Sequence, residues 1–153
     1  MPAWYDILEM SLERKIDTAQ IEQSASSIRA LIAQENERGV PSEHIVIAGF
    51  SQGGAVAYQT ALSYDKPLAG LLTLSTYLAT KDSLVLSDAN KNLKIAIHHG
   101  TQDPVVPVQL GQEAKAWLES KGYQPQFYSY PMAHQVCMPQ LNIIGKWLND
   151  VLA

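Results

Sequence analysis

Three side chains of complementary chemistry, a serine, an aspartate and a histidine, each follow a short apolar stretch of this chain. Ser51 lies in a Gly-Phe-Ser-Gln-Gly motif directly after a β-branched run, and Asp103 and His134 follow two later apolar runs. A serine hydroxyl becomes a competent nucleophile when a histidine takes its proton, and a carboxylate can hold that histidine in the required tautomer. These residue types suit cleavage of an acyl bond through a covalent acyl intermediate.

The residues around Ser51 are those of a sharp strand-to-helix turn. The apolar run at 45–49 predicts a strand, and residues 54–62 suit a helix. We expect glycine at Gly49 and Gly53 because a side chain at either position would collide with the neighbouring strand or helix. The backbone N–H of Gln52 would then point from the helix start and stabilise an oxyanion. An ordinary helix-capping serine is the alternative interpretation of this turn.

The apolar periodicity alternates between helices and strands along the chain. Helices are predicted from Asp17, as N-cap, to Gly39 and over 54–62, 107–121 and 139–152, and strands over 45–49, 68–74, 94–98 and 126–130. This alternation predicts an α/β fold with a mostly parallel sheet of about four strands and helices on both faces. Ser51, Asp103 and His134 would share the edge formed by the carboxyl ends of the strands, where such sheets bind ligands.

Two parts of the chain carry expectations about packing. Residues 1–16 show no clear period but are too apolar for a free tail, so we expect them to lie across the body of the domain. The final helix is expected to bury an apolar stripe that consists of Leu141, Ile144, Leu148 and Val151.

The composition is that of a single globular domain. A chain of 153 residues can bury a core, and its hydrophobic and charged fractions, 46% and 17%, are ordinary for such domains. The net charge of −4 and the lack of a basic cluster argue against a nucleic-acid partner. No apolar run approaches transmembrane length, the N-terminus does not resemble a secretion signal, and Cys137 is the single cysteine. These features favour a cytoplasmic protein.

Other reactive side chains have plainer interpretations. His98 and His99 close a predicted strand and are interpreted as packing or loop-anchoring groups. Cys137 is interpreted as a small packing residue, and a thiol nucleophile beside His134 is the less favoured alternative. No Cys/His spacing predicts a zinc site, and no glycine-rich loop has phosphate-binding spacing.

Four segments of the sequence together resemble one known family. They are Gly49-Phe50-Ser51-Gln52-Gly53-Gly54-Ala55, Leu74-Ser75-Thr76-Tyr77-Leu78, His99-Gly100-Thr101-Gln102-Asp103-Pro104-Val105-Val106-Pro107 and Tyr130-Pro131-Met132-Ala133-His134-Gln135-Val136-Cys137. These motifs resemble the carboxylesterase/acyl-protein thioesterase/lysophospholipase family over essentially the whole chain. The resemblance implies an α/β-hydrolase fold, a Ser51, Asp103 and His134 triad, ester or thioester hydrolysis without a cofactor, and frequently a dimer.

The same resemblance implies where substrate would bind. Trp4-Tyr5-Asp6 matches the loop that precedes the family's first long helix, and this loop and the one at Ser75 to Leu78 would flank the acyl groove. The expected substrate-binding residues are Trp4, Ser75, Tyr77 and Leu78. The sequence departs from the family at Ala133, where glycine is usual before the histidine.

A larger departure is at the N-terminus, because the chain begins where the family is already under way. It is expected to be a single, truncated α/β-hydrolase domain over residues 1–153 that lacks the family's first strands and a His-Gly-Leu-Gly-type loop. That loop would donate the second oxyanion N–H, and losing one such donor typically costs about 10²- to 10³-fold in rate. The strand at 45–49 would lie at the sheet edge, which favours pairing with a second copy or with a separate N-terminal piece.

The leading hypothesis is therefore a serine carboxylesterase acting on short-to-medium acyl esters, with acyl-protein thioesterase or lysophospholipase as variants within the same class. The alternative is an inactive or weakly active hydrolase fragment that serves only as a folded or assembling domain. A small-molecule binding module that uses the same cleft without turnover is a third interpretation.

Overall fold

The computed structural model describes the backbone of residues 3–153 and the side chains of residues 18–153. Its elements, in chain order, are α1 (Ala3–Glu37), η1 (Ser42–His44), β1 (Val46–Phe50), α2 (Gln52–Ser63), β2 (Gly70–Leu74), η2 (Asp88–Asn90), β3 (Ile95–Gly100), α3 (Val108–Ser120), β4 (Gln126–Tyr130) and α4 (Met138–Leu152). The predicted alternation of strands and helices is confirmed.

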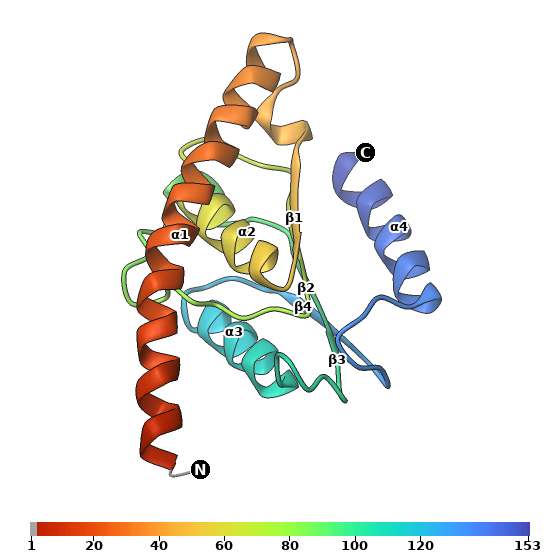
Figure 1. Cartoon of the computed structure of the whole chain (residues 1–153). Coiled ribbons are helices and arrows are strands. Elements are labelled where there is room, and N and C mark those ends of the chain that lie inside the picture. Colours follow the sequence, from red (N-terminus) through yellow and green to blue (C-terminus); the bar gives the residue numbers. More distant parts are fainter. Residues whose placement is uncertain (1–2) are drawn as a thin grey trace.

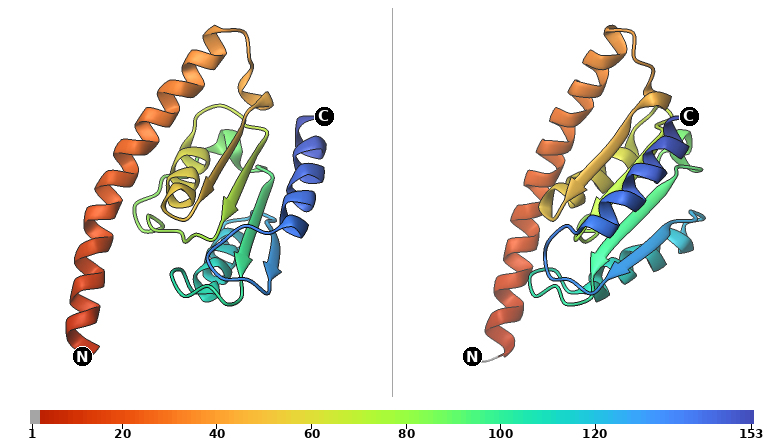
Figure 2. Two further views of the ribbon diagram at one scale, coloured as in Figure 1. Left: turned by 45° about the vertical axis from the view of Figure 1, so that its right-hand side comes forward. Right: turned by 90° about the vertical axis from the view of Figure 1, so that its right-hand side faces the viewer.

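The four strands form one parallel sheet in the order β1-β2-β3-β4. Helices α2 and α3 cover one face, α1 lies outside α2, and α4 covers the other face (Figures 1 and 2). All four strands run in the same direction, so their carboxyl ends meet at one edge of the sheet. Strand β1 is an edge strand, as the sequence predicts.

The core is divided between the two faces of the sheet. The larger part lies under α2 and α3, and its fully buried members include Tyr58, Leu62, Leu71, Ile97 and Leu118. The smaller part lies under α4 and consists of Leu72, Ala96, Ile144 and Trp147. The central strands β2 and β3 are buried on both faces, which explains the apolar sequence of β2, whereas the edge strands β1 and β4 are partly exposed.

Helix α4 presents most of its predicted stripe to the sheet, because Ile144 is buried and Leu148 and Val151 pack against the smaller part of the core. Leu141 is 48% exposed, so its expected burial is wrong, whereas Gln140 and Trp147 are buried. Trp147, which is not part of the predicted stripe, packs onto the backbone of Gly70. A Cβ atom at Gly70 would lie 2.7 Å from the Trp147 ring.

Helix α1 also differs from the prediction, because it begins at Ala3 rather than at an Asp17 N-cap. The backbone at Trp4-Tyr5-Asp6 is therefore helical rather than a loop, and the Trp4 side chain lies outside the described residues. Pro2 and Gly39 bound a stretch without proline or glycine, so no strong helix breaker interrupts it. Farther along α1, Ile21, Ala25 and Ile32 are buried at helical spacing, whereas Leu31 is 53% exposed.

Glycines allow the close approaches in the turn between β1 and α2, but they are not the pair that the sequence predicts. A Cβ at Gly49 would lie 2.1 Å from the carbonyl oxygen of Gly53, which confirms the expectation for Gly49. A Cβ at Gly53 would meet nothing within 4 Å, so the expectation for Gly53 is wrong. At Gly54 a Cβ would lie 2.4 Å from the Thr76 side chain, so Gly54 packs helix α2 against the loop after β2.

The two adjacent glycines should therefore respond oppositely to alanine. Gly54→Ala should lower the free energy of unfolding by about 1–3 kcal/mol through overpacking against Thr76. Gly53→Ala should raise it by about 0.4–1 kcal/mol because alanine restricts the unfolded chain and fits the helix. Urea denaturation of both variants beside the parent measures the difference, and equal effects would contradict this account of the turn.

Stability should also depend on pH through His98, a fully buried residue of β3. Burial lowers the pKa of His98 to about 4 from its ordinary value of 6.5. Between these values the unfolded chain binds more protons than the folded chain, so the free energy of unfolding should fall as pH falls from about 6.5 to 4. Urea denaturation across this range measures how the free energy of unfolding changes with pH, and this slope reports the protons taken up on unfolding. That proton uptake should be smaller in His98→Phe than in the parent, by up to about one proton.

Candidate active site

Ser51 occupies the sharp turn between β1 and α2, with φ 55° and ψ −124°. The Ser51 amide donates to the carbonyl oxygen of Leu74 at 2.9 Å, and the Thr76 hydroxyl donates to the carbonyl oxygen of Ser51. These bonds tie the turn to the end of β2, which compensates for a backbone conformation that non-glycine residues rarely adopt. The turn is therefore fixed by its neighbours as well as by its own sequence.

The structure brings the three predicted residues into one hydrogen-bonded chain. Ser51 Oγ lies 3.0 Å from His134 Nε2, and His134 Nδ1 lies 2.7 Å from Asp103 Oδ2. Because a carboxylate can only accept, His134 Nδ1 is the donor to Asp103, which leaves Nε2 of the neutral ring to accept the Ser51 hydroxyl proton. The side chains come from the carboxyl ends of β1, β3 and β4, as parallel topology requires.

The Asp103 carboxylate is buried but well supplied with hydrogen bonds. Its Oδ1 accepts the backbone N–H groups of Val105 and Val106, each at 2.8 Å. Burial alone would raise the pKa of Asp103, but the hydrogen bonds from His134, Val106 and Val105 outweigh it and hold the pKa below its ordinary value. The group is therefore an anion at neutral pH, beside the imidazole that it orients.

The loop that carries His134 crosses directly over the end of β3. A Cβ at Gly100 would lie 2.3 Å from the carbonyl oxygen of Met132 and 2.5 Å from that of Ala133. The amide of Gln102 donates to the Met132 carbonyl oxygen at 3.0 Å. Glycine at position 100 thus lets the histidine loop approach the aspartate loop closely. Among the described non-glycine residues only Ser51 and Ser75 have positive φ, so Ala133 fits without backbone strain.

Phe50 and Thr76 also contribute to the site, although sequence reasoning assigned neither a role. The Phe50 ring lies 4.8 Å from the His134 ring, centroid to centroid, and is 38% exposed. An aromatic residue next to the serine of the motif was the available signal for Phe50. Thr76 could not be found in this way, because its contact with Gly54 depends on the register between β1 and β2.

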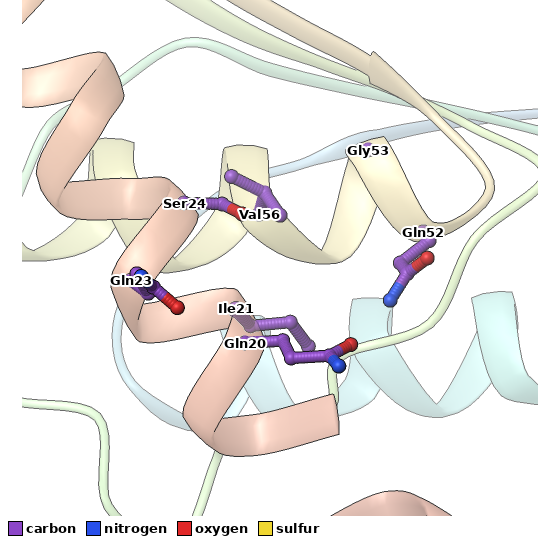
Figure 3. A pocket seen from close by; sticks show the side chains of 7 residues that line it. All are labelled: Gln20, Ile21, Gln23, Ser24, Gln52, Gly53 and Val56. Atoms are coloured by element: carbon purple, nitrogen blue, oxygen red, sulfur yellow. The ribbon is translucent and has the colours of Figure 1, made fainter. Parts of the chain in front are cut away.

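Gln52 is the first residue of α2, so its backbone N–H has no partner within the helix. A cavity of about 380 Å³ separates this helix start from α1; it is lined by Gln20, Ile21, Gln23, Ser24, Gln52, Gly53 and Val56. In Figure 3 the side chains of Gln20 and Gln52 extend towards the same part of this cavity. The start of α2 is thus bordered by polar groups of α1.

The residues expected to bind substrate lie in different surroundings. Ser75 has φ 52°, is fully buried, and its hydroxyl has no hydrogen-bond partner among the described residues. Tyr77 and Leu78 are half-buried, and Leu78 packs against the larger core. The Trp4 side chain is not among those described. Ser75, Tyr77 and Leu78 all lie in the loop after β2, the strand that pairs with β1.

Among the side chains of residues 18–153, no group of three or more histidine, cysteine, aspartate or glutamate residues could hold a metal ion. None of the described helices combines the length and apolarity needed to cross a membrane. Cys137 is half-buried and is the N-cap of α4, where its sulfur accepts a backbone N–H of the first turn.

Comparison with known proteins gives consistent matches. Residues 1–152 match the phospholipase/carboxylesterase family. The chain is 36% identical to acyl-protein thioesterase 1 of Neurospora crassa, covering 99% of this chain and 66% of that protein. It is 34% identical to acyl-protein thioesterase 1 of Mycosarcoma maydis, covering 99% of this chain and 70% of that protein. The chain therefore spans about two thirds of the length of these relatives.

The solved structures agree with the sequence comparison. The crystal structure of Arabidopsis thaliana SOBER1 is similar with a TM-score of 0.81 and 28% identity, over 88% of this chain and 66% of that one. The Bacillus cereus carboxylesterase shares the fold with a TM-score of 0.76 at 18% identity, over 88% of this chain and 63% of that one. The strand order, the serine turn and these matches lead to one assignment: the chain belongs to the phospholipase/carboxylesterase family of α/β-hydrolases.

Proposed function

We propose that the protein is a serine hydrolase that cleaves carboxylic esters through an acyl-enzyme. The observation that carries this proposal is the hydrogen-bonded chain from Ser51 Oγ through His134 to Asp103, with distances of 3.0 Å and 2.7 Å. A nucleophile, a base within reach of it and a carboxylate behind the base are the parts that acyl transfer needs. Membership of the phospholipase/carboxylesterase family supports the same reaction class.

Each residue of the proposed triad has one task. Ser51 Oγ attacks the acyl carbon while His134 Nε2 takes its proton, and His134 then donates that proton to the leaving alcohol or thiol. Water next attacks the acyl-enzyme, with His134 again acting as base. Asp103 orients the ring and stabilises the imidazolium that forms in both halves of the reaction. The backbone N–H of Gln52 stabilises the oxyanion.

The substrate is proposed to carry a short-to-medium acyl chain. Apolar side chains close to the triad are exposed, namely Phe50 at 38%, Val105 at 65% and Val136 at 41%, and these suit contact with an acyl chain. Trp4, Ser75, Tyr77 and Leu78 are proposed to complete the wall of this site. Thioester hydrolysis is the nearest variant, because two relatives are acyl-protein thioesterases.

The rival function is a folded or assembling domain with little or no turnover. This rival is favoured by the oxyanion site. Gln52 is the single backbone donor that the sequence identifies there, and an oxyanion site with one donor fewer gives a slower reaction. The experiment is hydrolysis of p-nitrophenyl butyrate, and of a butyryl thioester for comparison, by the parent and by Ser51→Ala. The parent should turn over the ester, and Ser51→Ala should lose at least about 10³-fold in kcat.

Ser120→Ala, a surface change at the end of α3, is the matched control and should retain the parental rate. A burst of p-nitrophenolate equal to the enzyme concentration would identify the acyl-enzyme. Absence of Ser51-dependent turnover in the parent would reject the hydrolase proposal and favour the assembling domain.

We further propose that the chain self-associates through the free edge of β1. Within a strand, successive residues direct their backbone groups to opposite sides, and Ser51 N–H bonds to Leu74 of β2. Gly49 and Ile47 therefore face β2, whereas the backbone groups of Ala48 face away from the sheet. An unpaired edge of this kind is a template for a strand of a second copy.

Ala48→Pro should abolish such association without removing a hydrogen bond between β1 and β2, because the lost N–H is the outward one. Ala48→Val retains that N–H and should associate like the parent, which makes it the matched control. Sedimentation velocity at about 50 μM measures the outcome. A parent that sediments as a monomer, or a proline variant that associates equally, would reject pairing through β1.

A further inference from the structure

Two adjacent histidines at the end of β3, His98 and His99, are both fully buried, and their side chains point to opposite faces of the sheet. The His98 ring stacks on Tyr128 and Tyr130, and its Nδ1 lies 2.9 Å from the Tyr130 hydroxyl. His99, one residue on, must point to the opposite face because side chains alternate along a strand. That face carries α3 and the turn that holds Asp103.

His99 is hydrogen-bonded to this turn rather than to the carboxylate itself. Its Nε2 lies 2.7 Å from the carbonyl oxygen of Val106, and because a carbonyl only accepts, Nε2 carries the hydrogen. The same Nε2 is 3.8 Å from Asp103 Oδ2, the oxygen that accepts from His134. Val106 is thus held on both sides: its N–H donates to Asp103 Oδ1 and its carbonyl oxygen accepts from His99.

The packing around the ring leaves the bond to Val106 as its one hydrogen bond among the described residues. Nδ1 of His99 is buried without a partner. The ring lies against helix α3, where a Cβ at Gly111 would come within 2.6 Å of Nδ1. An unpaired buried nitrogen costs free energy that an apolar side chain of similar size would avoid. The N–H donated to Val106 therefore explains a histidine here better than space-filling does.

We infer that His99 is a positioning residue, whose hydrogen bond to Val106 fixes the turn that aims the Asp103 carboxylate at His134. The inference rests on the proposed hydrolase function. Without the bond, the turn at 103–106 can relax, and the amides of Val105 and Val106 leave their optimal positions on Oδ1. Weaker hydrogen bonds at Oδ1 would in turn raise the pKa of Asp103.

The test compares variants that differ in one hydrogen-bond donor. Glutamine and methionine have similar length and volume, but only glutamine has an N–H that can reach Val106. His99→Met should lower kcat about 10- to 100-fold, because small displacements of catalytic groups have effects of this size. KM should change by less than about threefold, and His99→Gln should recover most of kcat.

Two further variants separate positioning from general destabilisation. His98→Met is the matched control, since it alters an equally buried histidine on the other face and should keep kcat within about threefold of the parent. Gly111→Ala leaves His99 in place but pushes its ring, while alanine favours the α3 helix. It should fold and should lower kcat in the same direction as His99→Met, so the test does not depend on the folding of one variant.

A direct readout is the downfield proton resonance of His134 Nδ1–H, which reports the bond to Asp103. It should be present in the parent and in His99→Gln, and shifted or lost in His99→Met. Parental kcat in both His99→Met and Gly111→Ala with an unchanged resonance, or an equal loss of kcat in His98→Met, would overturn the inference. A parent that shows the expected resonances but no Ser51-dependent turnover would reject the proposed function and leave the positioning role standing.

Discussion

A buried carboxylate is the constraint around which this site is arranged. The Asp103 side chain is removed from water, and a buried anion is tolerated only when its oxygens are fully hydrogen-bonded. Its donors come from two places: Val105 and Val106 on its own turn, and His134 on the loop after β4. Satisfying one charge therefore holds two loops together, and the imidazole is oriented as a consequence.

The same constraint shows why small residues recur at the carboxyl edge of the sheet. The two loops can meet only because Gly100 lets the backbone of Met132 and Ala133 pass over the end of β3. On the serine side, Gly54 lets Thr76 reach the Ser51 carbonyl oxygen. The geometry of the polar groups thus depends on backbone contacts that a single methyl group would disrupt.

Sequence reasoning predicted that Ser51, Asp103 and His134 would meet because that prediction required only the order of elements. Ser51, Asp103 and His134 each follow a strand, and parallel strands must end at one edge, so their meeting did not depend on details of packing. The register-dependent contacts were out of reach. Gly53 was chosen over Gly54 because the motif, and not the position of Thr76, was visible, and Leu141 was misplaced because the helix faces Gly70 through Trp147. The start of α1 was misplaced because a local N-cap signal at Asp17 competes with a long stretch that lacks helix breakers.

The strained turn at Ser51 has a consequence for how the sequence can change over generations. A φ of 55° suits glycine far better than serine, so mutation of this codon to glycine would relax the backbone while removing the proposed nucleophile. Selection for stability and selection for chemistry therefore act in opposite directions at this one position. A lineage that no longer needed the reaction would have reason to lose the serine early, before the rest of the fold had drifted. Under the proposed function, backbone strain at Ser51 is thus what accompanies a hydroxyl in this turn.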